Sequence, residues 1–257
     1  MNLIDRKRRD QTASRSSGLA RSLSKLGFCS RGQAWLLIEA GRVRVNSTIR
    51  RDPEWRVDLR RDRIAVDEEV VRGEDKVYLM LNKPRGLVTT TSDEQGRETV
   101  YDCLAGKGLP FVAPVGRLDK ASEGLLLFTN DSAWAARITD PESHVEKTYH
   151  VQVDCLADEG LASQLGVGAR VDGELLAAKG VSVLRHGTCN SWLEIVLDEG
   201  KNRHIRRLLE ALGVSVLRLV RVAIGQLALA DLAKGESRRL TMAEVRALAP
   251  ETRPGGR

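Results

Sequence analysis

The amino-acid sequence predicts a protein of mixed α and β structure, organised in two units of unequal size. The first quarter of the chain has two short helix patterns followed by strand-like segments, whereas strand-like and helical stretches alternate from residue 76 onward. An acidic stretch over residues 67–75 separates the two parts. The chain has 257 residues, 42% of them hydrophobic, which is enough for a sizeable core. Local pattern alone is compatible with an α/β or an α+β arrangement and does not define the order of the strands.

The first unit begins with two helix patterns. Leucines from Leu19 to Leu26 have helical spacing, and Gly27 can end that helix. Ser30 and Gln33 form a capping-box pattern, which predicts a second helix through Ala40. Strands are expected at 43–45 and around 64–66.

The second unit begins with an expected strand over 77–81, which runs into a turn rich in glycine and proline at 82–86. Another strand is expected over 192–197. The apolar residues between Ile205 and Leu212 recur with helical spacing, and Gly213 can end that helix.

The basic charge of the chain is concentrated in its first part. Residues 1–72 hold 17 Lys and Arg against 10 Asp and Glu, whereas the remainder holds 24 against 25. A local basic excess attracts polyphosphate because binding releases counterions. Charge alone is equally compatible with a nucleic-acid partner and with a surface that only confers solubility.

Several classes of protein are disfavoured by what the sequence lacks. The opening residues are charged with no apolar run behind them, so we expect a cytoplasmic protein. The four cysteines and four histidines are scattered, which argues against a disulfide framework and against a metal site.

The helix pair of the first unit carries a recognisable motif. Its sequence L-x-K-L-G-F-C-S-R-G-Q-A-W-L-L-I-E-A-G-R-V-R-V-N resembles the small RNA-binding module named after ribosomal protein S-four. The resemblance implies that a basic face contacts structured RNA, with Arg21, Lys25, Arg31, Arg42 and Arg44 as the candidate RNA-binding residues. The alternative is an ordinary solvated helix face.

The chemistry of the second unit is concentrated around Asp119. An aspartate on a loop just before a buried strand can be held rigidly, and a nearby arginine can keep it ionised to act as a nucleophile or base. Such an aspartate more often caps a turn. However, the whole string G-R-L-D-x-x-S-E-G-L-L-L-F-T-N-D closely resembles the catalytic motif of pseudouridine synthases that modify ribosomal RNA. The resemblance implies that Asp119 is the catalytic residue and that Arg117 supports the loop or the RNA backbone.

Two further motifs occur in the order of that family. The segment K-T-Y ending at Tyr149 resembles the one whose tyrosine contacts the target base, and a tyrosine offers both a stacking face and a hydroxyl. In the segment E-G-K-N-R-H-I-R-R, the resemblance implies that Arg206 forms an ion pair with Asp119 and that Ile205 packs beside the base. Lys201, Arg203 and Arg207 would then contact phosphates.

The family resemblance refines the predicted fold to α+β. It implies a mixed, mainly antiparallel sheet flanked by helices, preceded by the small helix-rich RNA-binding domain. The expected organisation is a disordered basic tail at 1–17, the S-four-like domain at 18–72, the catalytic domain at 73–248 and a flexible tail at 249–257.

The implied activity is isomerisation of a uridine in ribosomal RNA, without metal or cofactor, by a monomer that acts on RNA or pre-ribosomal particles. The catalytic stretches favour large-subunit RNA, with small-subunit RNA as the alternative. Two other functions are a non-catalytic RNA-binding or ribosome-assembly protein, and a hydrolase that uses Glu123 as a second carboxyl.

The sequence departs from the family pattern at two positions. Ala121 stands where Asp or Asn is common, and His204 stands where Gln or Glu is usual. Neither position carries a catalytic group, so these departures put substrate geometry in doubt more than activity.

Overall fold

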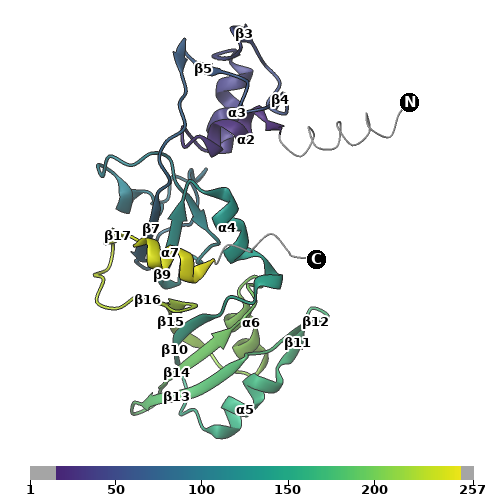
Figure 1. Cartoon of the computed structure of the whole chain (residues 1–257). Helices are drawn as coiled ribbons and strands as arrows, with labels where there is room; N and C mark the ends of the chain where they lie inside the picture. Colours follow the sequence, from purple (N-terminus) through teal and green to yellow (C-terminus); the bar gives the residue numbers. More distant parts are fainter. Residues whose placement is uncertain (1–15, 250–257) are drawn as a thin grey trace, which may run out of the picture. The chain divides into compact units, whose positions relative to one another are not determined.

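The computed structural model describes residues 16–249 and divides them into two compact units (Figure 1). The first unit comprises residues 16–77, 108–113 and 130–132, and the second comprises the rest of the described chain. The domain boundary expected between residues 72 and 73 remains a prediction. The tails expected over 1–17 and 249–257 lie outside the described residues except for Ser16, Ser17 and Ala249, of which Ser17 belongs to the first strand.

The first unit packs two short helices against small antiparallel sheets. Helices α2 (Leu19–Lys25) and α3 (Arg31–Glu39) come first. A four-stranded sheet has the order β3-β2-β5-β6, and β1 pairs separately with β4. These strands are β1 (Ser17–Gly18), β2 (Val43–Val45), β3 (Thr48–Ile49), β4 (Arg56–Val57), β5 (Ile64–Val66) and β6 (Glu69–Val70).

Local sequence signals explain the helix pair. The capping box is present, because Ser30 Oγ accepts from the Gln33 backbone N–H at 3.2 Å and Gln33 Oε1 accepts from the Ser30 N–H at 3.0 Å. Gly27 has a φ of +77°, which ends the first helix as its position predicts. The core of the unit is formed by buried apolar residues from both helices and from β2, β4 and β5.

The second unit is built on a nine-stranded sheet. Its main path has the order β13-β14-β10-β15-β9-β7-β17, while β16 pairs with β15 and β8 pairs with β9. The strands are β7 (Tyr78–Lys83), β8 (Ala113–Val115), β9 (Glu123–Thr129), β10 (Lys147–Val153), β13 (Gly180–His186), β14 (Ser191–Leu197), β15 (Val216–Ile224), β16 (Leu227–Ala228) and β17 (Ser237–Arg239). Along the main path only β9 and β15 pair in parallel, which confirms the mixed, mainly antiparallel sheet.

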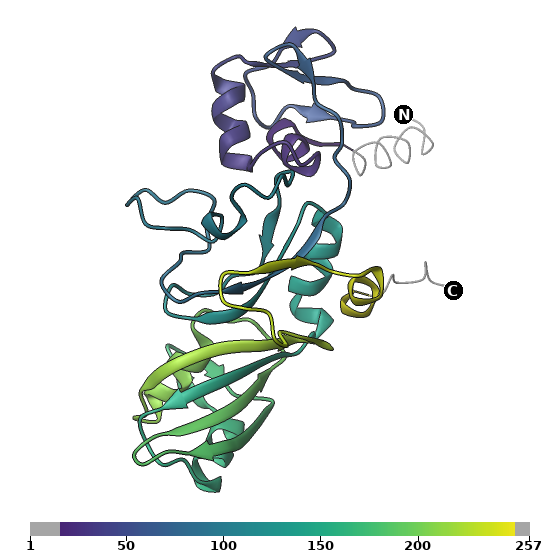
Figure 2. The same cartoon turned by 90° about the vertical axis from the view of Figure 1, so that its left-hand side faces the viewer.

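Helices cover this sheet, and the apolar residues buried between helices and strands form two separate cores. The helices are α4 (Ser132–Thr139), α5 (Glu159–Val167), α6 (His204–Ala211) and α7 (Met242–Leu248), with short 3-10 turns η1 (Asp102–Leu104) and η2 (Pro141–Ser143) and a hairpin of β11 (Ala169–Val171) and β12 (Glu174–Leu176). One core packs α5 and α6 on strands β10, β13, β14 and β15, which lie side by side in Figures 1 and 2. The other packs α4 and α7 on β7 and β9. Gly213 follows α6 with a φ of +74°, as predicted.

The two halves of the sheet meet where β9 runs beside β15. The register pairs Glu123 with Val220 and Gly124 with Arg221. A Cβ at Gly124 would lie 2.2 Å from the Arg221 carbonyl oxygen, and Gly124 has a φ of +100°, so both space and backbone conformation require glycine.

A buried ion pair reinforces the same junction. Glu123, whose side chain is 3% exposed, accepts from Arg218 Nε and Nη2 at 2.8 and 3.0 Å and from Lys234 Nζ at 2.5 Å. The hydrogen bonds from Arg218, followed by those from Lys234, lower the pKa of Glu123 to about 2. Glu123 therefore has a structural role, and this carboxylate is not available as the second acid of a hydrolase.

No helix in residues 16–249 is both long enough and apolar enough to cross a membrane.

Gly124→Ala should destabilise the second unit by at least about 3 kcal/mol, because the added methyl group forces β9 away from β15. The matched control is Gly213→Ala, which also has a positive φ but open space around its Cβ, and it should lose only about 1 kcal/mol. Urea unfolding measures both changes. Equal losses for the two variants would show that the close approach of β9 and β15 is unimportant.

Glu123→Gln should destabilise the chain by about 1.5–3 kcal/mol at pH 7, because two cations lose a charged acceptor. The pKa of Glu123 in the folded state, about 2, lies below its unfolded value. The stabilisation is therefore present above the unfolded pKa of about 4.3 and is lost as pH falls toward 2.

Urea unfolding at several pH values should accordingly show the difference between wild type and Glu123→Gln shrinking in acid. Glu194→Gln is the control, because among the described residues Glu194 forms its ion pair with His150 at the surface and should matter little. A difference that is independent of pH would contradict this account of Glu123.

Candidate functional site

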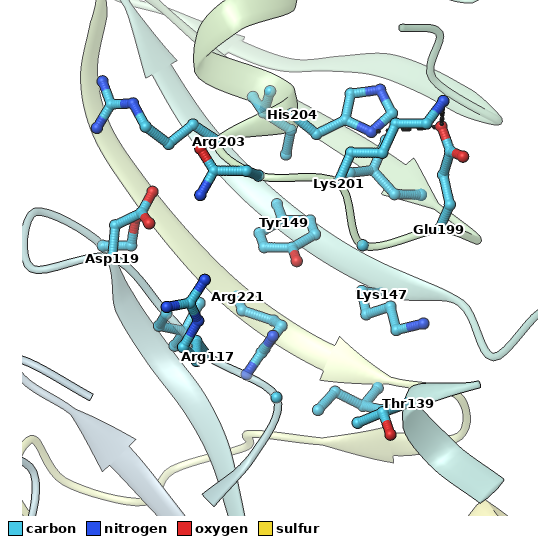
Figure 3. Close-up of a pocket in the computed structure, with 18 of the residues that line it drawn as sticks. Arg117, Asp119, Thr139, Lys147, Tyr149, Glu199, Lys201, Arg203, His204 and Arg221 are labelled. Atoms are coloured by element: carbon cyan, nitrogen blue, oxygen red, sulfur yellow. Dashed lines mark ion pairs between the residues drawn. The ribbon is translucent and has the colours of Figure 1, made fainter. Parts of the chain in front are cut away.

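The second unit contains a cavity of about 550 Å³ to which all three sequence motifs contribute. Its wall is formed by the loop after β8, the start of β10, the segment from Leu197 to Arg206 and the middle of β15. Figure 3 shows Tyr149 in the centre, with Asp119 on one side and the group of Glu199, Lys201 and His204 on the other. The volume lies within the range of about 300–1,000 Å³ typical of small-ligand sites.

Asp119 lies on a tight turn whose backbone carbonyls accept hydrogen bonds from neighbouring residues. The Ser122 N–H donates to the Asp119 carbonyl at 2.9 Å, and the Gly86 N–H donates to the Lys120 carbonyl at 2.8 Å. The Asp119 carboxylate itself has no hydrogen bond or ion pair with any residue in the described part of the chain. The turn therefore positions the side chain while its oxygens stay free for a ligand.

The ammonium group of Lys83 binds the backbone of this turn. It ends β7 and is fully buried, and its ammonium donates to the carbonyls of Ser122, Pro84 and Asp119 at 2.8, 3.0 and 3.2 Å. Burial lowers the pKa of Lys83 to about 8, although the charges of Asp119 and Glu123 oppose this shift. The local sequence pattern predicted only a turn at this stretch. A lysine that ends an otherwise apolar strand was the signal that could have identified it.

Arg206 approaches the same turn but does not bind as expected. Its Nη2 donates to the Ala121 carbonyl at 3.2 Å, and no direct ion pair joins Arg206 to Asp119, both of which the structure describes. The prediction of a direct ion pair is therefore wrong. Burial is the largest influence and lowers the pKa of Arg206, Arg203 lowers it further, and the nearby charge of Asp119 opposes both. The Nε of Arg206 is buried without a hydrogen-bond partner among the described residues.

Tyr149 and Ile205 both line the cavity, and their contacts with the target base remain a prediction. Tyr149 belongs to β10, opposite Ile195 of β14 and Arg221 of β15. Ile205 is 4% exposed and belongs to the core against which Tyr149 packs. These contacts hold an aromatic ring and an aliphatic side chain at the wall of one cavity.

Arg221 is a cavity residue that the sequence analysis missed. It is 5% exposed, its Nε donates to the Leu125 carbonyl at 2.7 Å, and its Nη2 is buried without a hydrogen-bond partner among the described residues. Figure 3 shows Arg221 and Arg117 on the same side of the cavity. An arginine in the middle of an apolar strand could have been recognised as unusual, but only the strand order shows that it faces Tyr149.

The three cations expected to contact phosphates differ in their surroundings. Lys201 and Arg203 line the cavity, although Lys201 pairs with Glu199 at 2.8 Å and donates to the Leu175 carbonyl at 2.8 Å. Arg207 does not line the cavity. It binds the β11–β12 hairpin through Glu174 at 3.0 Å and Asp172 at 3.2 Å, because helical spacing turns it away from Arg206. Arg207 therefore forms ion pairs within the protein, whereas the sequence predicted that it contacts phosphates.

The two departures from the family pattern also have structural explanations. Ala121 contributes its carbonyl to Arg206, so the contact does not depend on its side chain. His204 is 3% exposed and lies 3.5 Å from the Glu199 carboxylate, measured from Nδ1. Burial lowers the pKa of His204, opposed by Glu199.

The candidate RNA-binding residues of the first unit fall into two groups. Arg42 forms an ion pair with Asp67, and Arg44 forms one with Glu68 at 3.3 Å. Arg21 and Arg31 are exposed and lack an ion-pair partner among residues 16–249, and burial lowers the pKa of Lys25, helped by the charges of Arg21 and Lys76. The helix-borne cations are therefore the more available ones.

Within the described residues, no group of three or more His, Cys, Asp or Glu side chains could hold a metal ion.

Comparisons with known proteins identify the family. A sequence model of the RNA pseudouridylate synthase family matches residues 77–211, and one of the S4 domain matches residues 18–64. An uncharacterized RNA pseudouridine synthase of Rickettsia bellii is 38% identical over 223 residues, covering 87% of this chain and 96% of the relative. The ribosomal large subunit pseudouridine synthase B of Bacillus subtilis is 34% identical over 233 residues, covering 90% of this chain and 94% of the relative.

A solved structure agrees with these relatives. The crystal structure of a pseudouridylate synthase is similar with a TM-score of 0.61 and 32% identity, covering 90% of this chain and 99% of that one. The confirmed α+β fold and the converging motifs fit that similarity. This chain belongs to the RNA pseudouridylate synthase family and is an RNA pseudouridine synthase with an S4 RNA-binding domain.

Proposed function

We propose that the chain isomerises one uridine of large-subunit ribosomal RNA, with the Asp119 carboxylate as the nucleophile. The observation that carries this proposal is the position of Asp119 in the cavity, with its backbone fastened and its carboxylate oxygens free among the described residues. The name of the Bacillus subtilis relative supports large-subunit RNA as the substrate.

A uridine inside folded RNA must leave its stack to reach such a cavity. Flipping costs a few kcal/mol, which contacts to the extruded base have to offset. The ring of Tyr149 and the aliphatic side chain of Ile205 provide apolar contacts, and the Tyr149 hydroxyl can exchange a proton with the base. The two residues therefore hold the uracil beside Asp119.

The reaction breaks the bond between ribose carbon 1′ and N1 of the uracil, rotates the uracil, and forms a bond from carbon 1′ to carbon 5. Carbon 5 loses its proton and N1 gains one, so the product is an isomer of uridine. Three first steps begin from the Asp119 carboxylate: attack on the glycosidic carbon, attack on carbon 6 of the ring, or removal of a sugar proton. In each of them, the cationic side chains of Arg206 and Arg221 stabilise negative charge within the cavity. None of these steps consumes an oxidant, a reductant or water.

Lys83 acts as a positioning residue for this chemistry. Two of its three hydrogen bonds, those to the Asp119 and Ser122 carbonyls, hold this turn. A small displacement of a reacting group costs up to about 10²-fold in rate. The carboxylate keeps its place only while this ammonium holds the turn.

A test in cells addresses both the residue and the substrate. Pseudouridines in ribosomal RNA are mapped in cells that have the wild-type protein, no protein, or the Asp119→Asn variant. One large-subunit site should disappear without the protein and should not return with Asp119→Asn, because an amide is a poor nucleophile and base. A lost site in the small subunit would overturn the substrate assignment. Full restoration by Asp119→Asn would overturn the role of Asp119. If no site changes when the protein is absent, a non-catalytic RNA-binding protein becomes the alternative.

Lys83→Met should lower kcat by roughly 10²-fold with little change in RNA affinity, because the turn loses its two hydrogen bonds from the ammonium group. Wild-type kcat should also fall as pH rises above about 8, where the neutral amine has one N–H fewer to donate. The control is Lys107→Met, which removes a surface lysine that pairs with Glu236. Steady-state kinetics across pH measure both effects.

An unchanged kcat for Lys83→Met, with a normal melting curve, would exclude the positioning role.

A further inference from the structure

A second cavity of about 460 Å³ also has Asp119 in its wall. It shares part of its wall with the first cavity, namely Arg117, Leu118, Asp119 and Asn202. Its remaining wall is formed by Lys120 and by residues of the loop between Val88 and Arg97. A molecule that fills the first cavity at Asp119 therefore has the second cavity directly beside it.

Backbone hydrogen bonds join the two ends of the loop that lines this second cavity. Val88 forms a bridge with Thr99, the Val88 N–H donates to the Glu98 carbonyl at 3.1 Å, and the Val100 N–H donates to the Val88 carbonyl at 3.0 Å. These contacts form a parallel bridge, so the two ends of the loop lie side by side. The residues between them accordingly form a defined surface.

Asp93 organises the tip of the loop. Its carboxylate accepts from the backbone N–H groups of Gln95 and Arg97 at 3.1 and 2.9 Å, and from Arg97 Nε and Nη2 at 3.0 and 2.6 Å. The side-chain hydrogen bond from Arg97 is the main cause that lowers the pKa of Asp93 to about 2. Asp93 and Arg97 thus neutralise each other and shape the wall.

Thr89 fastens this loop to the Asp119 turn. Its hydroxyl donates to the Leu118 carbonyl at 2.7 Å, and the Leu118 N–H donates to the same hydroxyl at 3.4 Å. Leu118 is the residue immediately before Asp119. The second cavity consequently has a set position relative to the reacting carboxylate.

The chemistry of the second cavity fits a nucleotide. Arg117 and Lys120 are exposed cations that have no ion-pair partner among the described residues, so both can bind a phosphate. Hydroxyl and amide groups of Thr90, Ser92 and Gln95 line the same space and can donate to and accept from the edge of a base. Such polar groups select hydrogen-bonding ligands over apolar ones.

We propose that this second cavity binds the nucleotide that directly precedes or follows the target uridine in the same RNA strand. The inference rests on the proposed function, because the first cavity has to hold the flipped uridine. A phosphodiester joins consecutive nucleotides, so the neighbour of a uridine held at Asp119 lies within reach of a cavity that shares that residue as a wall. The loop from Val88 to Thr99 then contributes to the choice of uridine by reading an adjacent base.

The test uses full-length protein and short synthetic RNA hairpins that carry the uridine mapped in cells. One hairpin is intact, one has an abasic residue before the uridine, and one has it after. The variants are Ser92→Phe, which fills the cavity from an exposed position, and Lys120→Ala, which removes a phosphate contact. Lys107→Ala is the matched control, a surface lysine outside both cavities.

The wild type should lose about fivefold to tenfold in kcat/KM on one of the two abasic hairpins, as expected for one or two lost hydrogen bonds. Ser92→Phe should lose a similar factor on the intact hairpin and should no longer distinguish it from that abasic one. Lys120→Ala should raise KM and reduce the dependence of log KM on log salt concentration by about one unit, whereas Lys107→Ala should not.

Equal kcat/KM of the wild type on all three hairpins would overturn this inference while leaving the proposed function intact. Discrimination retained by Ser92→Phe, or the same salt dependence for Lys120→Ala and Lys107→Ala, would overturn it as well. If the wild type converts no uridine in either ribosomal RNA, the proposed function fails first and the inference fails with it.

Discussion

The close approach of β9 and β15 at Gly124 is the constraint on which the rest of the second unit depends. This is the parallel pairing on the main path of the sheet, and it joins the half covered by α5 and α6 to the half covered by α4 and α7. Asp119 lies just before β9, whereas Arg221 and Leu219 project from β15 into the same cavity. The junction therefore brings together chemical groups that are about a hundred residues apart in the sequence, and any substituent at Gly124 would separate them.

Around this junction, buried and half-buried cations bind the backbone and leave the Asp119 carboxylate free. Lys83 donates to three carbonyls, Arg206 donates to the Ala121 carbonyl, and Arg221 donates to the Leu125 carbonyl. Burial lowers the pKa of Lys83 and of Arg206, which is the consequence of placing charged groups in a poorly solvated site. Their positive charges act on the Asp119 carboxylate without a hydrogen bond or ion pair to its oxygens. The cavity therefore combines positive charge with a carboxylate whose oxygens remain accessible.

Local sequence predicted those features that local interactions determine. The capping box at Ser30 and the glycine ends at Gly27 and Gly213 are present because each depends on a few neighbouring residues. The motif resemblance identified Asp119, Tyr149 and Arg206 as residues of one cavity, which the structure brings together.

The remaining features depend on tertiary contacts that no local pattern contains. The strand order, the position of Lys83 under the turn and the inward direction of Arg221 all require the assembled sheet. Arg207 follows Arg206 in the sequence but points to Glu174, since successive helix positions face different directions. The expected ion pair between Arg206 and Asp119 is absent because the Ala121 carbonyl, two residues later, takes the guanidinium.

The most direct measurement is single-turnover conversion of the mapped uridine by purified wild type and Asp119→Asn, with RNA affinity determined on the same samples. The account predicts that Asp119→Asn binds RNA nearly as well as wild type but converts it at least about 10⁴-fold more slowly, since the nucleophile is lost while the binding surfaces remain. Conversion at a rate close to that of wild type, with RNA bound to saturation, would contradict the assignment of Asp119 as the group that performs the chemistry.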